Sequence, residues 1–432
     1  MTWRKIRLGE VCTIEKGNIG IMKAIPGEFP LVVLGEERRT HNEYQFDDEA
    51  VIIPLVSSTG HGHRSMKRIF YQTGKFSVGS ILCAVIPKDK TKLSAEFLYR
   101  YLDFNKEKEL VGRMRGMANV TLPMKEIADV EIPLPPIEHQ KKLIEEFQKL
   151  ETANNQITTE LSHQLDLVRQ LRQAFLREAM QGKLVPQDTA DEPAEILLEK
   201  IKAEKEKLIA EKKIKLGKIQ EPEKEQVLFD IPSNWLWCIL DDICVSITDG
   251  THQTPTYTQT GRVFLSAQNV KPFRFMPENH KFVSEEAYND YIRGRKAEKG
   301  DLLVARVGAG IGETAVIDKD IDFAFYVSLG LVKPFQDFLH SDYLAMILNS
   351  PFGVNYAKGN ISSKGGSAGN FNLGRIRSFP VSLPPLAEQK RIVEKLEKLM
   401  KYCDELEANI RESKANAESL LQVALKEALE PK

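Results

Sequence analysis

The sequence lacks any long apolar run. Of its 432 residues 42% are hydrophobic, yet no stretch approaches eighteen consecutive apolar side chains, and the first residues lead into a mixed segment. Its five cysteines are odd in number and never form a CxxC pair, so neither a disulfide framework nor a zinc ribbon is predicted. We expect a cytoplasmic protein with no membrane partner.

The chain also lacks a charge of one sign. Its 60 basic and 61 acidic side chains give a net charge of -1, which taken alone argues against a protein that coats nucleic acid through a strongly basic surface. Only residues 1–135 carry a small excess of basic groups. Charge therefore points to no partner.

Catalytic signatures are missing as well. The sequence has no Walker A motif, HExxH, GxSxG or kinase set, and the glycines of Gly308–Gly312 lack the rest of a dinucleotide fingerprint and predict a turn. His61 and His63 have no third ligand at metal spacing, so no metal site is expected. Leu134 and Leu383 stand where the tetrad of amino-methyltransferases has Asn or Asp, so we expect no unaided methylation.

An internal repeat is the most informative feature that is present. Leu134–Lys141 returns as Leu383–Lys390, and the same offset of 249 relates Leu171–Ala179 to Leu420–Ala428. A constant offset predicts one continuous rod in each half. Upstream the offset varies: Trp3 matches Trp235 at 232, and residues 79–82 match 300–303 at 221, as expected where surface loops differ in length.

Both rods have the three-four spacing of a coiled-coil seam. The predicted seam positions are Leu143, Phe147, Leu150, Asn154, Ile157, Leu161, Gln164, Val168, Leu171 and Phe175, with equivalents Ile392, Leu396, Leu399, Cys403, Leu406, Ile410, Ser413, Ala417, Leu420 and Ala424. The alternative is two amphipathic helices that each pack on their own domain. Because each rod is too long for a domain of this size, we predict that the two rods pair antiparallel.

The predicted fold class is α+β, with two globular domains joined by two long antiparallel helices in a pseudo-two-fold tandem repeat. The domains cover residues 1–135 and 232–383, and the helices cover 136–185 and 384–432. Residues 186–231 form a charged connector with a short helix from Glu192 to about Leu216, whose i,i+4 ion pairs are typical of a solvated helix.

Three polar stretches offer side chains that suit DNA phosphates or base edges. The alternatives are a plain solvated loop or a glycine-rich connector. The candidate residues are Thr59, His61, His63 and Arg64 in the first stretch; Arg113, Arg115 and Asn119 in the second; and Lys358, Asn360, Ser362, Lys364 and Asn370 in the third.

Several short motifs give the sequence a resemblance to a known family, and this resemblance covers nearly the whole chain. It rests on Trp235–Ile243, Thr248–His252, Lys299–Leu303, Arg306–Gly308, Asn370–Leu373 and Leu383–Val393, and on Gly182–Asp188 with Glu192–Ala194 for the connector. The layout resembles the specificity (S) subunit of a type I restriction-modification system. Residues 18–75 match no motif, as expected of a target recognition domain.

The resemblance implies that each globular half is a target recognition domain, and it adds His252 and Arg306 to the DNA-contacting candidates. The two domains would read the two parts of a split DNA site, and the helices would set the gap and dock two modification (M) methyltransferase subunits. Restriction (R) subunits would join them. S-adenosylmethionine, ATP and Mg²⁺ would belong to those partners, with no cofactor in this chain. The recognition subunit of a related type II enzyme and a coiled-coil protein scaffold remain alternatives.

Overall fold

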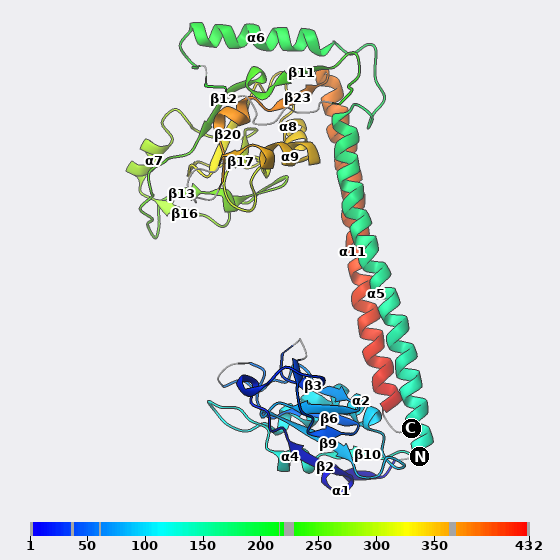
Figure 1. Ribbon diagram of the computed structural model, residues 1–432. Coiled ribbons are helices and arrows are strands. Elements are labelled where there is room, and N and C mark those ends of the chain that lie inside the picture. Colours follow the sequence, from blue (N-terminus) through cyan, green and yellow to red (C-terminus); the bar gives the residue numbers. More distant parts are fainter. Residues whose placement is uncertain are drawn as a thin grey trace. The chain divides into compact units, whose positions relative to one another are not determined.

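The structure, a computed structural model, describes residues 3–35, 39–59, 62–215, 217–219, 229–362 and 369–429. The chain divides into two compact units (Figure 1). The first unit is Met1–His163 with Ile410–Lys432, and the second unit is Gln164–Asn409. Both boundaries fall inside long helices, so each unit combines a globular domain with parts of two helices.

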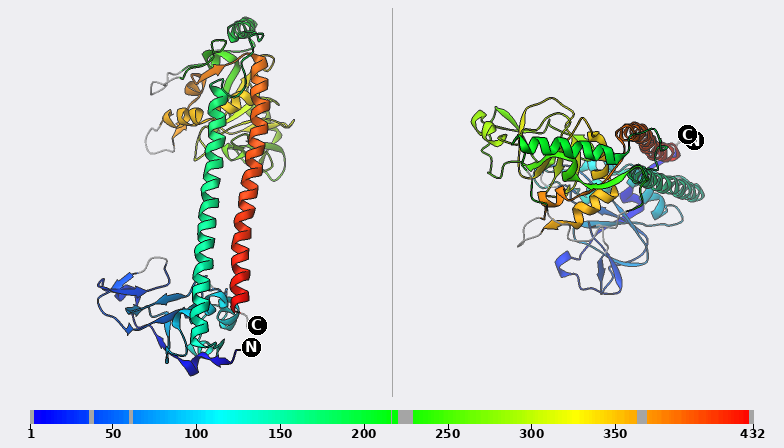
Figure 2. Two further views of the ribbon diagram at one scale, coloured as in Figure 1. Left: turned by 90° about the vertical axis from the view of Figure 1, so that its right-hand side faces the viewer. Right: turned by 90° about the horizontal axis from the view of Figure 1, so that it is seen from above.

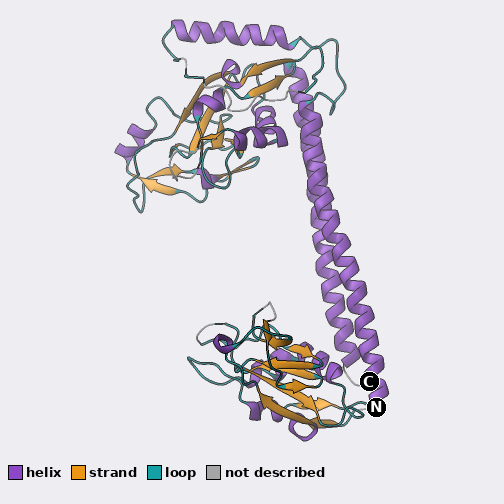
Figure 3. Cartoon of the chain, in the orientation of Figure 1, coloured by secondary structure: helices purple, strands orange, loops and turns teal. Residues whose placement is uncertain are grey.

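Two sheets form the domain of the first unit (Figure 3). The antiparallel sheet has the order β2 (Cys12–Lys16), β9 (Leu82–Pro87), β6 (Ala50–Pro54) and β7 (Phe70–Gln72). The other has the order β4 (Arg39–His41), β3 (Phe29–Val32), β8 (Lys75–Val78) and β5 (Phe46–Asp47), with β3 and β8 parallel. A third ladder pairs β1 (Lys5–Arg7) with β10 (Glu131–Pro133) at the helix entrance.

The second unit repeats this plan. Its four-stranded sheet has the order β12 (Cys244–Asp249), β20 (Leu329–Pro334), β17 (Leu302–Ala305) and β18 (Thr314–Val316). Beside it are β16 (Lys281–Val283), β13 (Arg262–Leu265) and β19 (Phe323–Phe325), while β11 (Leu236–Ile239) pairs with β23 (Pro380–Leu383).

Strand order corrects one predicted match between the halves. Residues 300–303 lead into β17, which is the third strand of its sheet. The third strand of the corresponding sheet in the first unit is β6, and both strands are buried throughout. Residues 79–82 instead lead into β9, which corresponds to β20. The match of residues 79–82 with residues 300–303 was therefore wrong, because the same Gly-x-x-Leu pattern precedes two strands that hold different places in their sheets.

The predicted long helices are present as α5 (Ile137–Met180) and α11 (Leu386–Leu429), which lie side by side (Figure 2). Contacts inside each unit show that they run antiparallel. In the first unit Lys414 Nζ donates to Ser162 Oγ at 3.1 Å. In the second unit Arg172 Nη2 lies 2.7 Å from Asp404 Oδ1 and 3.2 Å from Glu407 Oε2. The predicted antiparallel pairing is confirmed.

Several predicted seam positions are exposed instead of lying in the interface. Val168 and Cys403 are buried, but Ile157 is 50% exposed and its equivalent Leu406 is 46% exposed. The neighbouring polar residues Thr158 and Glu407 are partly buried instead. The apolar stripe is wider than the seam between two helices, so one row of apolar side chains faces outward.

Each Leu-Pro-Pro segment joins its helix to its domain through one buried glutamine. Gln140 Nε2 donates to the carbonyl oxygens of Pro135 and Lys92, both at 2.8 Å, and its Oε1 accepts the Ser94 N–H at 2.9 Å. In the second unit Gln389 Nε2 donates to the Pro384 carbonyl oxygen at 3.1 Å, and its Oε1 accepts the His340 N–H at 2.9 Å.

The two hydrogen bonds that the glutamine Oε1 atoms accept explain the spacing between the two prolines and the glutamine. Ser94 and His340 are the N-cap residues of α2 (Ala95–Phe104) and α8 (Ser341–Asn349). Both glutamines have 0% exposed surface. Because an unpaired buried amide is costly, the glutamine four residues after the second proline fixes how each helix leaves its domain.

The C-terminal turn of each long helix packs in a hydrophobic core. In the first unit Leu429 is buried with Leu102 of the first domain and Phe147 of α5. In the second unit Met180, its equivalent at the offset of 249, is buried with Trp235 and Leu383. The connector helix α6 (Ala194–Ala210) is shorter than predicted and buries Leu197 and Ile201 in that same second core.

Candidate nucleic-acid interface

Two of the predicted polar stretches meet in the first domain. The Ser57 N–H donates to the Val120 carbonyl at 3.0 Å, and the Leu122 N–H donates to that of Leu55 at 2.9 Å. Arg115 and Thr121 exchange backbone hydrogen bonds at 2.8 Å, which closes a hairpin loop between them. The loop that follows Ser57 and this hairpin loop are therefore neighbours, although about sixty residues separate them.

Their side chains are largely open to solvent. Thr59, His63, Arg64, Arg115 and Asn119 are all exposed. Thr59 Oγ1 donates to Ser65 Oγ at 3.1 Å, and Ser57 Oγ donates to the His63 carbonyl at 2.6 Å, so the loop has internal support.

Two arginines differ in how they are held. Arg115 is ion-paired with Glu126 while its side chain stays 70% exposed. Arg113 is half-buried and lies 3.8 Å from Glu109. Arg115 is therefore the better placed of the two to meet a ligand. His61 lies outside the described residues.

Arg306, in the second domain, is a correction. It is only 4% exposed, and its guanidinium donates to the carbonyls of Phe371 at 3.0 Å and Val327 at 2.9 Å and to Asp249 Oδ2 at 2.7 Å. Burial lowers the pKa of Arg306, and Asp249 opposes that shift. Arg306 joins neighbouring strands, and its guanidinium is buried.

Asn360 is a second correction, since it is 0% exposed and its Nδ2 donates to the Tyr356 carbonyl at 2.9 Å. It ends α9 (Pro351–Gly359), in whose last turn Lys358 is exposed. Asn370 is half-buried in the ladder of β21 (Ile361–Ser362) with β22 (Asn370–Phe371). Lys364 and the side chain of Ser362 lie outside the described residues.

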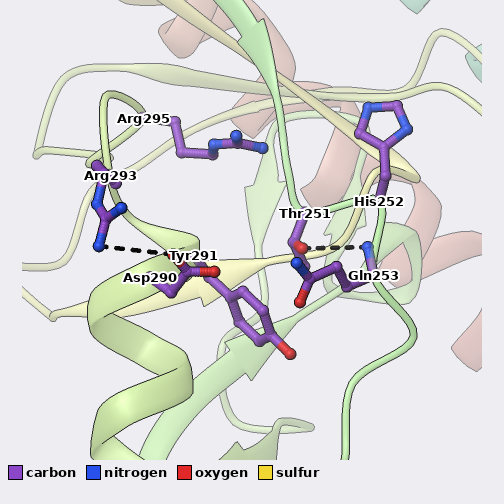
Figure 4. Close-up of a pocket in the computed structure, with 7 residues that line it drawn as sticks. All are labelled: Thr251, His252, Gln253, Asp290, Tyr291, Arg293 and Arg295. Atoms are coloured by element: carbon purple, nitrogen blue, oxygen red, sulfur yellow. Dashed lines mark hydrogen bonds and ion pairs between the residues drawn. The ribbon is translucent and has the colours of Figure 1, made fainter.

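His252 lies at a pocket of about 300 Å³ that its neighbours Thr251 and Gln253 line together with Asp290, Tyr291, Arg293 and Arg295 (Figure 4). Its side chain is 70% exposed, and its Nε2 lies 3.1 Å from Asp249 Oδ2. Sequence reasoning missed Gln253, Arg293 and Arg295. A signal was available, because Arg293-Gly294-Arg295 resembles the Arg115-Gly116 turn of the first domain.

No group of three potential metal ligands occurs among the described residues. Over the same residues, every helix is too short or too polar to span a bilayer.

The family model described as "Type I restriction modification DNA specificity domain" matches residues 1–167 and 233–413, which together include both globular domains and parts of both long helices. The chain belongs to this family. The family model matches each half of the chain once, in agreement with the four-stranded sheet that both units contain. It also includes the exposed first-domain loops and the second-domain pocket.

Several curated relatives from Escherichia coli are similar to this chain. The chain is 29% identical to the type I restriction enzyme EcoAI specificity subunit over 57% of this chain and 42% of that protein. It is 22% identical to the EcoDI specificity subunit over 99% of this chain and 87% of that protein. The chain thus spans less than half the length of EcoAI and also of the EcoEI subunit, of which it covers 45%.

Solved structures share the fold. The HsdS subunit from Thermoanaerobacter tengcongensis aligns over 99% of this chain and 96% of its own, with a TM-score of 0.54 and 18% identity. A chain from a structural study of complex assembly and conformational transition of the type I R-M system aligns over 99% and 98%, with a TM-score of 0.60 and 19% identity. Both alignments support the α+β fold with two long helices.

Proposed function

We propose that this protein is the non-catalytic specificity subunit of a type I restriction-modification complex. Each recognition domain reads one part of a bipartite DNA site. The observation that carries the proposal is the duplication: the family model matches twice, and each match leads into one of two antiparallel helices. Two readers on one spacer suit a target of two parts separated by a gap of fixed length.

In the first domain, Arg115, Asn119, His63 and Arg64 supply the side chains for this reading. Guanidinium suits guanine and amide suits adenine in the major groove, while exposed cations also meet phosphates. The weak net charge of the chain fits a subunit that shares phosphate neutralisation with its partners.

The partners in this proposal are two M subunits, with R subunits added to the complex. Outward apolar residues recur at equivalent positions of the two helices: Ile157 and Leu171 of α5 are 50% and 38% exposed, and Leu406 and Leu420 of α11 are 46% and 68% exposed. Equivalent apolar faces on a pseudo-two-fold pair of helices suit two copies of one partner. S-adenosylmethionine, ATP and Mg²⁺ act in those partners.

The test is to co-express the chain with the methyltransferase of the neighbouring gene and to select DNA from random duplexes with the purified complex. We expect a two-part motif with a fixed gap, and Arg115→Ala should relax only one part of it. Equal loss in both parts would contradict the two-reader arrangement. If no complex forms and no DNA is selected, a protein-interaction scaffold becomes the better explanation.

A matched pair tests the docking surface. Ile157→Asp places a charge on an outward apolar position, while Gln156→Asp changes its exposed polar neighbour. We expect Ile157→Asp to reduce the number of bound M subunits from two to one, as measured by native mass spectrometry, and Gln156→Asp to leave two.

A further inference from the structure

In the second domain two predicted DNA-contacting side chains, Arg306 and Asn360, are buried. The surface of the same domain has a pocket that cationic and amide side chains line. The wall formed by Thr251 and Gln253 follows β12, and the wall formed by Asp290 and Tyr291 belongs to α7 (Glu285–Tyr291) (Figure 4). Arg293 and Arg295 follow that helix directly. The His252 ring points away from the other residues in this view.

The wall of residues 249–253 is held rigidly. The Thr251 N–H donates to the Phe325 carbonyl at 2.9 Å, and the Gln253 N–H donates to Thr251 Oγ1 at 3.2 Å. A Cβ at Gly250 would lie 2.1 Å from the Phe325 oxygen, so only glycine fits there. The ion pair between buried Arg306 and partly buried Asp249 fixes the start of this wall.

Arg295 connects the two walls. Its Nη1 donates to the Gly250 carbonyl at 2.8 Å and lies 3.3 Å from that of Asp249. Within the part of the chain that the structure describes, its Nε and Nη2 have no hydrogen-bond partner, so this guanidinium is preorganised and still has donors to offer. Arg293 is 81% exposed and lies 3.6 Å from Asp290, a pair that solvent weakens.

We propose that this pocket is where the second domain contacts its part of the DNA site: Arg293 and Arg295 bind backbone phosphate, and the amide of Gln253 reads a base edge. This inference rests on the proposed function, and it assigns the DNA-contacting residues of the second domain. Guanidinium forks are suited to phosphate oxygens, and the donor and acceptor of a glutamine amide match the N6 and N7 atoms of adenine. Arg306 is then a positioning residue that acts through Asp249.

The variants are chosen to spare the fold. Gln253→Ala and Arg293→Ala alter exposed side chains, and Gln259→Ala and Arg274→Ala remove the same groups from exposed positions of the same domain that do not line the pocket. Each variant is co-purified with the methyltransferase, and its melting temperature is compared with that of the wild type.

Selection from random duplexes and binding at several salt concentrations then supply the readouts. Gln253→Ala should reduce base preference about ten- to hundredfold at one position in the part of the motif that Arg115→Ala leaves intact. Arg293→Ala should weaken binding to all sequences alike and reduce the salt dependence by about one phosphate contact. Gln259→Ala should keep the wild-type motif, and Arg274→Ala should keep the wild-type affinity and salt dependence.

The outcomes separate the inference from the proposed function. A wild-type two-part motif that Gln253→Ala leaves unaltered would overturn the pocket as a reading site. A change in the part that Arg115→Ala also affects would overturn its assignment to the second domain. A wild-type complex that selects no two-part motif would overturn the proposed function itself.

Discussion

Replacing Gln389 or Gln140 by leucine should loosen the unit to which each glutamine belongs. Leucine keeps the approximate size of the side chain but removes every hydrogen bond. Gln389→Leu leaves the His340 N–H and the Pro384 carbonyl unpaired, and Gln140→Leu leaves the Ser94 N–H and the carbonyls of Lys92 and Pro135 unpaired.

The expected losses follow from the number of bonds. A buried polar group without a partner costs about 1–3 kcal/mol, and part of each site is open to water, so we expect about 2 kcal/mol for Gln389→Leu and about 3 kcal/mol for Gln140→Leu. At about 1.4 kcal/mol per tenfold change, these losses correspond to about 30-fold and about 100-fold faster exchange of the protected amides.

Native-state hydrogen exchange read by mass spectrometry is the suitable assay, because a chain of two units has no single free energy of unfolding. Gln389→Leu should accelerate exchange at the start of α8, and Gln140→Leu should do so at the start of α2. Gln156→Leu, on the exposed surface of α5, is the control. The reasoning is refuted if either buried variant behaves like this control, or if Gln389→Leu has the larger effect.

Three further predictions concern buried or paired charges. Arg306→Ala should destabilise the second unit by about 3–5 kcal/mol, because Asp249 loses its buried partner; an unchanged melting temperature would contradict the structural role. Burial raises the pKa of Glu388 above its usual 4.5, while Trp235 Nε1 and Gln187 Nε2 donate to it. A raised folded pKa gives stability that is present below pH 4.5 and is lost as the pH rises through the folded value. The free energy of opening of the second unit, measured by native-state hydrogen exchange, should therefore increase for Glu388→Gln relative to the wild type between pH 4.5 and pH 7. Arg172→Ala should cost about 1 kcal/mol or less at low salt and less still at high salt, because its ion pairs with Asp404 and Glu407 are partly exposed; melting temperatures of Arg169→Ala, which breaks an exposed pair with Asp166, provide the comparison.

The long helices could be predicted from the sequence because a sustained period and a constant offset of 249 leave few alternatives. The predicted helix starts at residues 136 and 384 agree with Ile137 and Leu386 to within two residues. The seam could be predicted only in part, since a wide apolar stripe does not say which of its rows meets the other helix. That depends on the rotation of each helix, which its domain fixes through Gln140 or Gln389.

The candidate site was harder to predict because residue type does not reveal burial. Arg306 and Asn360 have the chemistry of DNA contacts, but tertiary structure uses their donors for the carbonyls of Phe371 and Tyr356. Arg293 and Arg295 are separated from Gln253 by about forty residues, so only the folded chain brings them to one pocket. In the first domain the two loops were each predicted, and their proximity comes from the pairing of residues 55–57 with 120–122.

The most direct test of the central claim is to express this chain with its neighbouring methyltransferase in a host without DNA methylation, and to map modified adenines by single-molecule sequencing. Two readers joined by the same pair of helices predict modification at a two-part motif whose gap is the same at every site. Modification at a continuous motif, or at two half-motifs with variable separation, would contradict the account.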